Sequence, residues 1–159
     1  EAFENTRKEI LCKSRNLIEL KQDILKMREK MLDVHPNPTP LFDIKHDRGG
    51  IIDVEFIVQY LVLGYASQFP QLTGNIGNIA LLKLAGELGL VPAELATQAR
   101  TAYREYRRLQ HRFRLGGEPE LTSAPLSKDK SEKFARIAAD HLSNDRLSVL
   151  QLWDAVFRL

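Results

Sequence analysis

The segment from Phe42 to Phe56 holds the residues whose types and spacing come closest to an active site. It contains Gly49-Gly50, followed by Asp53 and Glu55. On a strand the two carboxylates would share one face, as a two-metal site requires. The apolar residues after Gly50 recur with helical spacing, and on a helix residues two apart diverge by roughly 200°. We therefore expect no metal site from this pair alone.

The residues of this segment also have structural interpretations. Asp53 falls in the first turn of the expected helix, where a carboxylate is stabilised by the helix dipole. Glu55 lies in a largely apolar helix, so we expect it to be buried and paired with Lys45 or with an arginine. Gly49-Gly50 precedes the helix N-terminus, a position that can receive a phosphate, although two glycines alone are weak evidence for such a site.

Arginine residues are concentrated between positions 100 and 114, which hold six arginines and one glutamate. The positions that share one helical face, opposite an apolar stripe, are Arg100, Arg104, Arg107, His111 and Arg114. Two interpretations stay open. The face could bind an anion, which could be phosphate, nucleic acid or an acidic protein. It could instead be an ordinary solvated face whose arginine stems pack over a neighbouring element. Nucleic acid is the weaker choice, because the basic excess is confined to one helix. We favour an acidic protein partner.

No other residues of the sequence form a recognisable catalytic or metal centre. The histidines, His35, His46, His111 and His141, do not have the spacing of zinc ligands, and Cys12 has no histidine nearby in sequence to activate it. The sequence has no phosphate-binding loop, dinucleotide-binding or nucleophile-elbow motif. We therefore predict no catalytic residue and no metal site in this chain.

The composition is that of an ordinary globular protein. The chain has 159 residues, of which 43% are hydrophobic and 28% charged, and this length corresponds to about one domain. The net charge of +2 gives no reason to expect nucleic acid or a membrane as partner. A single cysteine excludes an intrachain disulfide and favours a cytoplasmic location. The most apolar run, Phe56–Ala66, is shorter than the ~20 residues that span a bilayer.

Helical periodicity dominates the sequence, and we expect an all-α helical bundle of about six helices in a single domain, residues 1–159. A long helix over residues 1–35, uninterrupted by proline or glycine, leads into a bundle formed by residues 36–159. The other expected helices cover 51–67, 78–88, 92–115, a segment from Ser131 through Ile137 to Leu142, and 146 to near the end. A short extended and loop insert is expected near 41–50, and a polar loop over Gly116–Lys130.

The segment around Gly49-Gly50 resembles the glutamine synthetase adenylyltransferase family (glutamate–ammonia-ligase adenylyltransferase). The stretches that carry the resemblance are Phe42-Asp43-Ile44-Lys45, Gly49-Gly50-Ile51, Asp53-Val54-Glu55-Phe56 and Gln59-Tyr60-Leu61-Val62-Leu63. Less specific matches continue through Leu72-Thr73, Asn78, Leu82, Ala102-Tyr103, Leu109 and His111. Aspartate at position 53, with the Gln-Tyr-Leu-Val-Leu that follows, is similar to the adenylylating, C-terminal half of these bifunctional enzymes.

The resemblance implies a helical domain that follows a nucleotidyltransferase domain. The full enzyme would use ATP and Mg²⁺ to transfer AMP to a tyrosine of glutamine synthetase and so regulate nitrogen assimilation. Its partners would be glutamine synthetase, the PII signal protein and the upstream catalytic domain. The basic face between positions 100 and 114 would contact either the catalytic domain or an acidic patch of the synthetase. The family's Gly-Ser and Asp-x-Asp elements do not occur in this sequence, so we expect the chain alone to bind neither cofactor and to be inactive. The resemblance places Lys45, Gly49, Gly50, Asp53 and Glu55 at the border of the nucleotide site.

Two alternatives stay open. PII uridylyltransferases carry a similar helical domain after a similar catalytic domain, although the Tyr-Leu-Val-Leu continuation favours the adenylyltransferase. The other alternative is a non-catalytic interaction module whose basic helix docks an acidic protein. The chain begins at Glu1, already inside a helical pattern, so we expect it to be a piece of a longer protein. An upstream Gly-Ser and Asp-x-Asp in the full reading frame would favour the enzyme.

Overall fold

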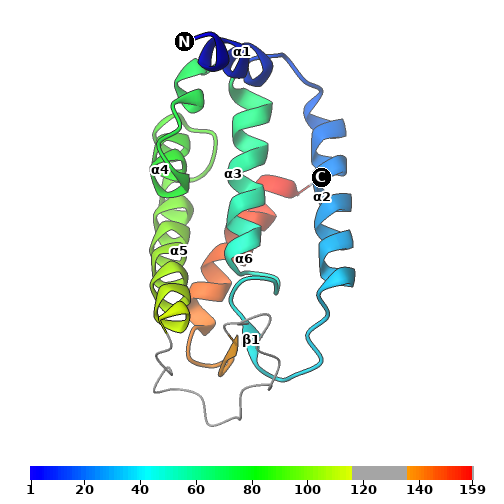
Figure 1. Cartoon of the computed structure of the whole chain (residues 1–159), viewed down its shortest axis with the longest axis vertical. Coiled ribbons are helices and arrows are strands. Elements are labelled where there is room, and N and C mark those ends of the chain that lie inside the picture. The colour runs from blue at the N-terminus through cyan, green and yellow to red at the C-terminus, as the bar shows by residue number, and fades with distance from the viewer. Residues whose placement is uncertain (116–135, 159) are drawn as a thin grey trace.

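The computed structural model describes residues 1–115 and 136–158, and over these ranges it confirms the expected all-α class (Figure 1). The helices are α1 (Ala2–Leu11), α2 (Leu17–Val34), α3 (Ile51–Tyr65), α4 (Asn78–Glu87), α5 (Ala93–Arg114) and α6 (Ser143–Phe157). A 3-10 helix, η1 (Pro70–Thr73), lies between α3 and α4. Two short strands, β1 (Phe42–Asp43) and β2 (Arg136–Ile137), pair with each other. None of the described helices is long and apolar enough to cross a bilayer.

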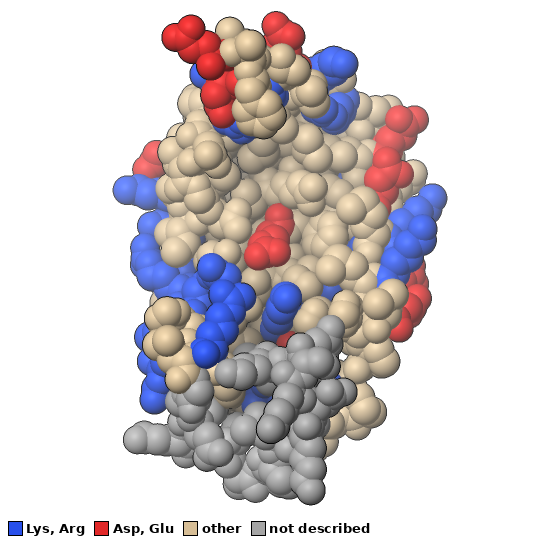
Figure 2. All heavy atoms as spheres, in the orientation of Figure 1, with Lys and Arg blue, Asp and Glu red and all other residues tan. Residues whose placement is uncertain are grey.

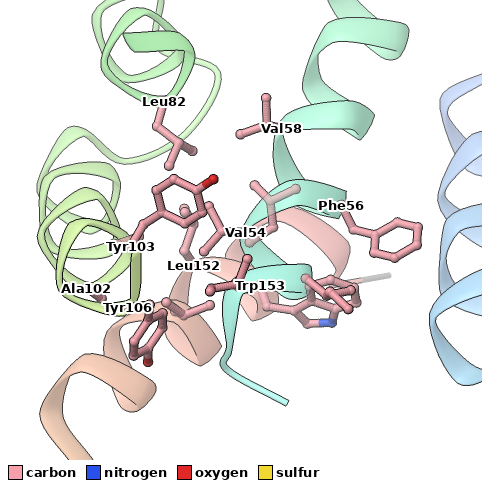
Figure 3. Packing of buried hydrophobic residues seen from close by; sticks show 14 of the residues in the cluster. Val54, Phe56, Val58, Leu82, Ala102, Tyr103, Tyr106, Leu152 and Trp153 are labelled. Atoms are coloured by element: carbon pink, nitrogen blue, oxygen red, sulfur yellow. The ribbon is translucent and has the colours of Figure 1, made fainter. Parts of the chain in front are cut away.

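Helix α3 is the centre of the bundle because it is apolar on almost every side. It packs against α2, α4, α5 and α6, while α5 also packs along α4 and α6. Figure 3 shows Val54 and Val58 on the side of α3 that faces α4 and α5, and Phe56 on the side that faces α2. Trp153 and Leu152 of α6 complete this core, and all five side chains are buried. The first turn of α3, which follows Gly49-Gly50, therefore lies deep in the molecule.

The predicted long N-terminal helix over residues 1–35 is wrong, because the chain breaks into α1 and α2 between Leu11 and Leu17. Both helix ends at the break have side-chain caps. The Asn16 carboxamide oxygen accepts hydrogen bonds from the N–H groups of Ile18 and Glu19, at 3.0 and 3.2 Å. The Arg15 guanidinium donates to the carbonyl oxygens of Ile10 and Leu11. These bonds replace those that a continuous helix would make, so the break needs neither proline nor glycine.

The helix predicted from Ser131 through Leu142 is also wrong where the structure describes it. Ile137 lies in β2, which pairs antiparallel with β1 in the register Phe42 with Ile137 and Asp43 with Arg136. The Ile137 side chain is fully buried. Pairing with β1 and burial of Ile137 outweigh the local helical spacing, because tertiary contacts override weak propensity. The start of the predicted helix at Ser131, and the predicted loop over 116–130, lie outside the described residues.

The remaining predicted elements are confirmed, with small shifts at their ends. Helices α3, α4 and α5 match the expected ranges to within two residues, and α6 begins three residues early, at Ser143. Gly89 follows α4 with a φ of +74°, the left-handed conformation of a C-cap glycine. The insert near 41–50 is extended only at Phe42–Asp43 and is otherwise built of turns.

Candidate functional site: the Gly-Gly element and its buried charges

We call residues 42–53 the Gly-Gly element. It consists of β1, a compact turn and the first residues of α3. The N–H of Gly50 donates to the Asp47 carbonyl oxygen, and those of Ile51 and Ile52 donate to the carbonyl oxygens of Ile44 and Lys45, at 2.7 and 3.1 Å. The Gly49 N–H donates to the Asp53 carboxylate at 2.7 Å. These four N–H groups are therefore bonded within the chain, and they are the donors that a phosphate at the paired glycines would need.

Both glycines are required by the geometry of this turn. Gly49 has a φ of +84°, a conformation that other residues rarely adopt. Gly50 has an ordinary backbone conformation, but a Cβ atom on it would lie 2.5 Å from the Ile44 carbonyl oxygen. The turn passes too close to the Ile44 backbone, just after β1, for any side chain at position 50. The Gly-Gly pair thus has a complete structural explanation.

Asp43 and Asp47 hold the first half of the element together. One Asp43 carboxylate oxygen accepts hydrogen bonds from the N–H groups of Lys45 and His46, both at 3.0 Å. The Asp47 carboxylate accepts from the Asp43 N–H at 3.0 Å and from the Asn37 side chain at 2.8 Å. Short polar side chains that bond to nearby backbone in this way fix a turn locally. Both oxygens of the Asp43 carboxylate have partners within the element, and one oxygen of Asp47 accepts two hydrogen bonds.

Asp53 is the buried anchor of the site, with no exposed surface. Its carboxylate lies 2.5 Å from Nε of Arg28 on α2 and 3.3 Å from Nε of Arg48. The Arg28 guanidinium also donates to the His46 carbonyl oxygen at 2.7 Å. Together with the Gly49 N–H, these contacts give the buried carboxylate the partners that a charge in a low-dielectric interior needs. The network ties α2, the Gly-Gly element and α3 to one another.

Aromatic and arginine side chains from α5 and α6 close the site. The Tyr106 hydroxyl of α5 donates to the Gly49 carbonyl oxygen at 2.9 Å, and Arg146 Nε of α6 donates to the Arg48 carbonyl oxygen at 2.9 Å. The Arg48 guanidinium lies over the Trp153 ring, with 4.5 Å between the guanidinium carbon and the ring centroid. Such contacts are favourable and fix the orientation of the guanidinium. The element is therefore held from four helices.

The His46 imidazole is buried within this element. Its Nδ1 lies 3.2 Å from the Asp43 carboxylate, and its ring stacks on His35 with 4.2 Å between centroids. Burial lowers the pKa of His46 below its ordinary value of 6.5, and this effect outweighs the nearby Asp43 carboxylate, which acts in the opposite direction. We infer a neutral ring that donates its Nδ1 hydrogen to Asp43 at neutral pH.

Along one side of α5 lie the five basic residues predicted from the sequence, which are Arg100, Arg104, Arg107, His111 and Arg114. Arg104, Arg107, His111 and Arg114 are exposed and Arg100 is half-buried. Among residues 1–115 and 136–158 none of the five forms an ion pair with Asp or Glu. Glu105, the acidic residue in this part of α5, pairs instead with Arg108 at 2.5 Å.

A model of the GlnD PII-uridylyltransferase family matches residues 19–158 of the chain. The chain belongs to this family. Bifunctional glutamine synthetase adenylyltransferase/adenylyl-removing enzymes are similar to it over almost its whole length. The identity is 68% to the enzyme of Nitrosomonas europaea over 99% of the chain, 66% to that of Nitrosomonas eutropha over 99%, and 47% to that of Aromatoleum aromaticum over 98%. The resemblance to this class of enzyme is thereby confirmed.

This member of the GlnD PII-uridylyltransferase family spans only a small part of those relatives. It covers 17% of the length of the two Nitrosomonas enzymes and 15% of that from Aromatoleum aromaticum. The similarity therefore describes one segment of a much longer enzyme in each relative.

The five residues predicted to border a nucleotide site separate into two groups in this family member. Gly49, Gly50 and Asp53 are buried together in the Gly-Gly element, whereas Lys45 and Glu55 are exposed. The prediction that Glu55 is buried and paired is wrong. Asp53, two residues earlier and on a different side of α3, is the carboxylate that faces the core. Lys45 and Glu55 are the members of the set whose charged groups are available to a ligand or a neighbouring domain.

A metal does not fit the described part of the site. No group of three or more His, Cys, Asp or Glu side chains among residues 1–115 and 136–158 is arranged to hold a metal ion. Asp53 is bonded to two arginines and a backbone N–H, and Asp43 to two backbone N–H groups. A carboxylate whose oxygens already accept such bonds is a poor ligand for Mg²⁺. Catalytic steps through a metal are therefore not assigned to these residues.

Sequence reasoning missed Arg28, Tyr106 and Arg146 as parts of the site. Arg28 had a signal, because it lies four residues after Ile24 and three before Met31, on the core face of α2. It is only 1% exposed. An arginine in an apolar stripe indicates a buried acidic partner, and the sequence supplies Asp53 as one candidate. Tyr106 and Arg146 had no such signal, because their partners are backbone carbonyl groups that only the fold brings near.

Proposed function

We propose that the chain is a helical module of a bifunctional glutamine synthetase adenylyltransferase/adenylyl-removing enzyme. The observation that carries the proposal is the 68% identity to the Nitrosomonas europaea enzyme over 99% of the chain. The whole enzyme would transfer AMP from ATP to a tyrosine of glutamine synthetase in the cytoplasm, with Mg²⁺ held by a separate catalytic domain. The PII signal protein and the catalytic domain would be further partners.

In this proposal the module contributes rigid support rather than the reacting groups. The buried Arg28–Asp53 pair and the Gly49-Gly50 turn fix the position of the element, and the exposed Lys45 and Glu55 are the charged side chains that border the nucleotide site. A lysine ammonium group at that border would attract the phosphates of ATP. The module alone would be inactive, because its sequence has no Asp-x-Asp element.

A second function is kept because the matching family model is described as a PII-uridylyltransferase. A module of that enzyme would accompany a domain that transfers UMP to the PII protein. The relatives that match almost the whole chain at 68%, 66% and 47% identity all carry the adenylyltransferase name. High identity over the whole chain is the more specific observation, and it favours the adenylyltransferase.

The test is a transfer assay with the protein encoded by the full reading frame. We expect label from ATP, carried on the α-phosphate, to appear on glutamine synthetase in the presence of Mg²⁺, and label from UTP not to appear on PII. The chain of 159 residues alone should transfer neither label above a no-enzyme control. Label on PII from UTP would support the uridylyltransferase. A reading frame without an upstream Gly-Ser and Asp-x-Asp domain would contradict both enzymes and favour an interaction module.

A further inference from the structure

The outer side of α5 carries a row of four arginines and a histidine, and no Asp or Glu in the described part of the chain forms an ion pair with them. We call the row the arginine face and define it as Arg100, Arg104, Arg107, His111 and Arg114. In Figure 2, blue side chains line the left edge of the molecule, where Figure 1 places α4 and α5. The face extends over about 21 Å, since a helix rises about 1.5 Å per residue.

Hydrogen bonds within α5 neutralise little of the positive charge on these guanidinium groups. Arg107 donates to the neutral side chain of Gln110 at 2.8 Å. Arg108 occupies both oxygens of Glu105, at 2.5 and 3.0 Å, and this hydrogen bonding lowers the pKa of Glu105. The Nε of Arg100 is buried and makes no hydrogen bond within the described residues. A buried donor without a hydrogen bond costs free energy, so the Arg100 guanidinium is only partly satisfied by the described residues.

Helix α5 cannot turn this face away from solvent. Its opposite side supplies buried residues to the core along the whole length, and it packs against both α4 and α6. The residues that fix this orientation are Ala96, Ala99, Ala102, Tyr103, Tyr106, Leu109 and Phe113. Like charges spaced three and four residues apart repel one another and destabilise the helix. The fold therefore holds a repulsive row of guanidinium groups in a fixed geometry.

We infer that the arginine face docks an acidic patch on the surface of a folded protein partner. Guanidinium groups match carboxylates with paired hydrogen bonds, and a rigid row of them complements a row of Asp and Glu on another protein surface. A nucleic acid is the less suitable partner, because the net charge of the chain is only +2 and its basic residues are not spread over a broad face. The inference rests on the proposed function for its choice of probe, which is glutamine synthetase.

The experiment measures binding of the chain to purified glutamine synthetase as a function of salt. The test variant is Arg104→Glu with Arg107→Glu, and the matched control is Lys26→Glu with Lys30→Glu, which changes the net charge equally at exposed positions of α2. We expect the test variant to weaken binding about tenfold or more and the control by less than about twofold. Raising the salt concentration should weaken binding of the unaltered chain, because exposed charges are screened.

A second variant separates charge from the specific shape of the guanidinium group. Arg104→Lys with Arg107→Lys keeps the charge but cannot make paired hydrogen bonds. It should therefore bind more weakly than the unaltered chain and more tightly than the charge-reversal variant. Circular dichroism should be unchanged in all variants because these side chains are exposed. The melting temperature should not fall, because charge reversal relieves the repulsion along the row. Equal weakening by the test and control variants, salt-independent binding, or no binding of the chain to glutamine synthetase would each overturn the inference. So would tighter binding to a DNA duplex than to glutamine synthetase.

The outcome is distinguishable from a failure of the proposed function. If the full-length protein transfers AMP to glutamine synthetase and the Arg104→Glu, Arg107→Glu variant shows an unchanged KM for the synthetase, the docking surface is contradicted and the function stands. If the full-length protein transfers no AMP while the chain binds the synthetase through the arginine face, the docking surface stands and the proposed function fails.

Discussion

Arg28 of α2 and Asp53 of α3 form a fully buried ion pair, with 2.5 Å between Nε and the carboxylate oxygen. The two residues are 25 positions apart in the chain. The pair joins α2 to the Gly-Gly element, because the same guanidinium also donates to the His46 carbonyl oxygen. Ile24 and Arg28 are the two buried residues of α2, and the ion pair adds to the apolar packing of its partly buried residues Leu17, Leu20, Leu25 and Met31.

Removal of Arg28 should therefore destabilise the protein strongly. In Arg28→Met the Asp53 carboxylate stays buried and loses one of its two arginine neighbours. Breaking a buried ion pair from one side costs about 3–5 kcal/mol, and we expect a loss at the lower end of that range because Arg48 remains. The free energy of unfolding from urea titration provides the measurement. Lys26→Met, at an exposed position of the same helix, is the control and should change it by less than about 0.5 kcal/mol. A similar small change in Arg28→Met would contradict the role of the pair.

Substitution of Gly50 should be costly for reasons of space alone. A Cβ atom there would lie 2.5 Å from the Ile44 carbonyl oxygen, while the backbone conformation suits any residue. We expect Gly50→Ala to lower the free energy of unfolding by about 1–3 kcal/mol. Gly89→Ala is the matched comparison, since position 89 has open space but a φ of +74°, and strain of that kind costs about 1 kcal/mol. Thermal and urea denaturation of both variants would show which substitution lowers the free energy of unfolding more, and we expect it to be Gly50→Ala. A smaller loss in Gly50→Ala than in Gly89→Ala would show that the turn can relax.

Substitution of Lys45 and Glu55 should separate function from stability. Both side chains are exposed, so Lys45→Ala and Glu55→Gln should each change the free energy of unfolding by less than about 0.5 kcal/mol. If the two residues border the nucleotide site, AMP transfer by the full-length protein should fall in both variants, with a raised KM for ATP in Lys45→Ala. Gln59→Ala, at another exposed position of α3, serves as the control. Transfer at the unaltered rate in both variants would show that neither side chain takes part.

Acidification should destabilise the protein through His46. Burial holds the pKa of the His46 imidazole in the folded protein below 6.5, its ordinary value in the unfolded chain. Between these two pKa values the unfolded chain therefore binds more protons than the folded protein does. The contribution of His46 to the free energy of unfolding is complete above pH 6.5. It decreases as the pH falls below 6.5, and it stops changing once the imidazole of the folded protein is also protonated. Urea titrations between pH 7.5 and about 5 should show this slope, and it should be smaller in His46→Asn, which keeps a donor beside Asp43. The exposed His141→Gln serves as the control. An unchanged slope in His46→Asn would assign the pH dependence to other groups.

The sequence by itself determined the fold class and most of the helices, because these depend on local periodicity. The apolar run after Gly50 predicted α3 and its central place, and the arginine spacing after Pro92 predicted one cationic side of α5. The sequence also located the Gly-Gly element, since paired glycines before a helical pattern indicate a turn with unusual backbone requirements. Local patterns of this kind reflect forces between residues that are neighbours along the chain.

Only the tertiary structure decided which charged residues are buried and which helices are continuous. Periodicity placed Glu55 in an apolar helix, but the Arg28 side chain reaches Asp53 instead, because α2 packs on that side of α3. The break before Asn16 depends on hydrogen bonds from Arg15, one of which reaches the Leu63 carbonyl oxygen of α3. Ile137 becomes a strand residue because Phe42 lies beside it. For Asp53 and Ile137 the deciding free energy comes from a partner distant in sequence, and the spacing around Asp53 or Ile137 does not identify that partner. The break before Asn16 combines local caps with the distant hydrogen bond from Arg15 to Leu63.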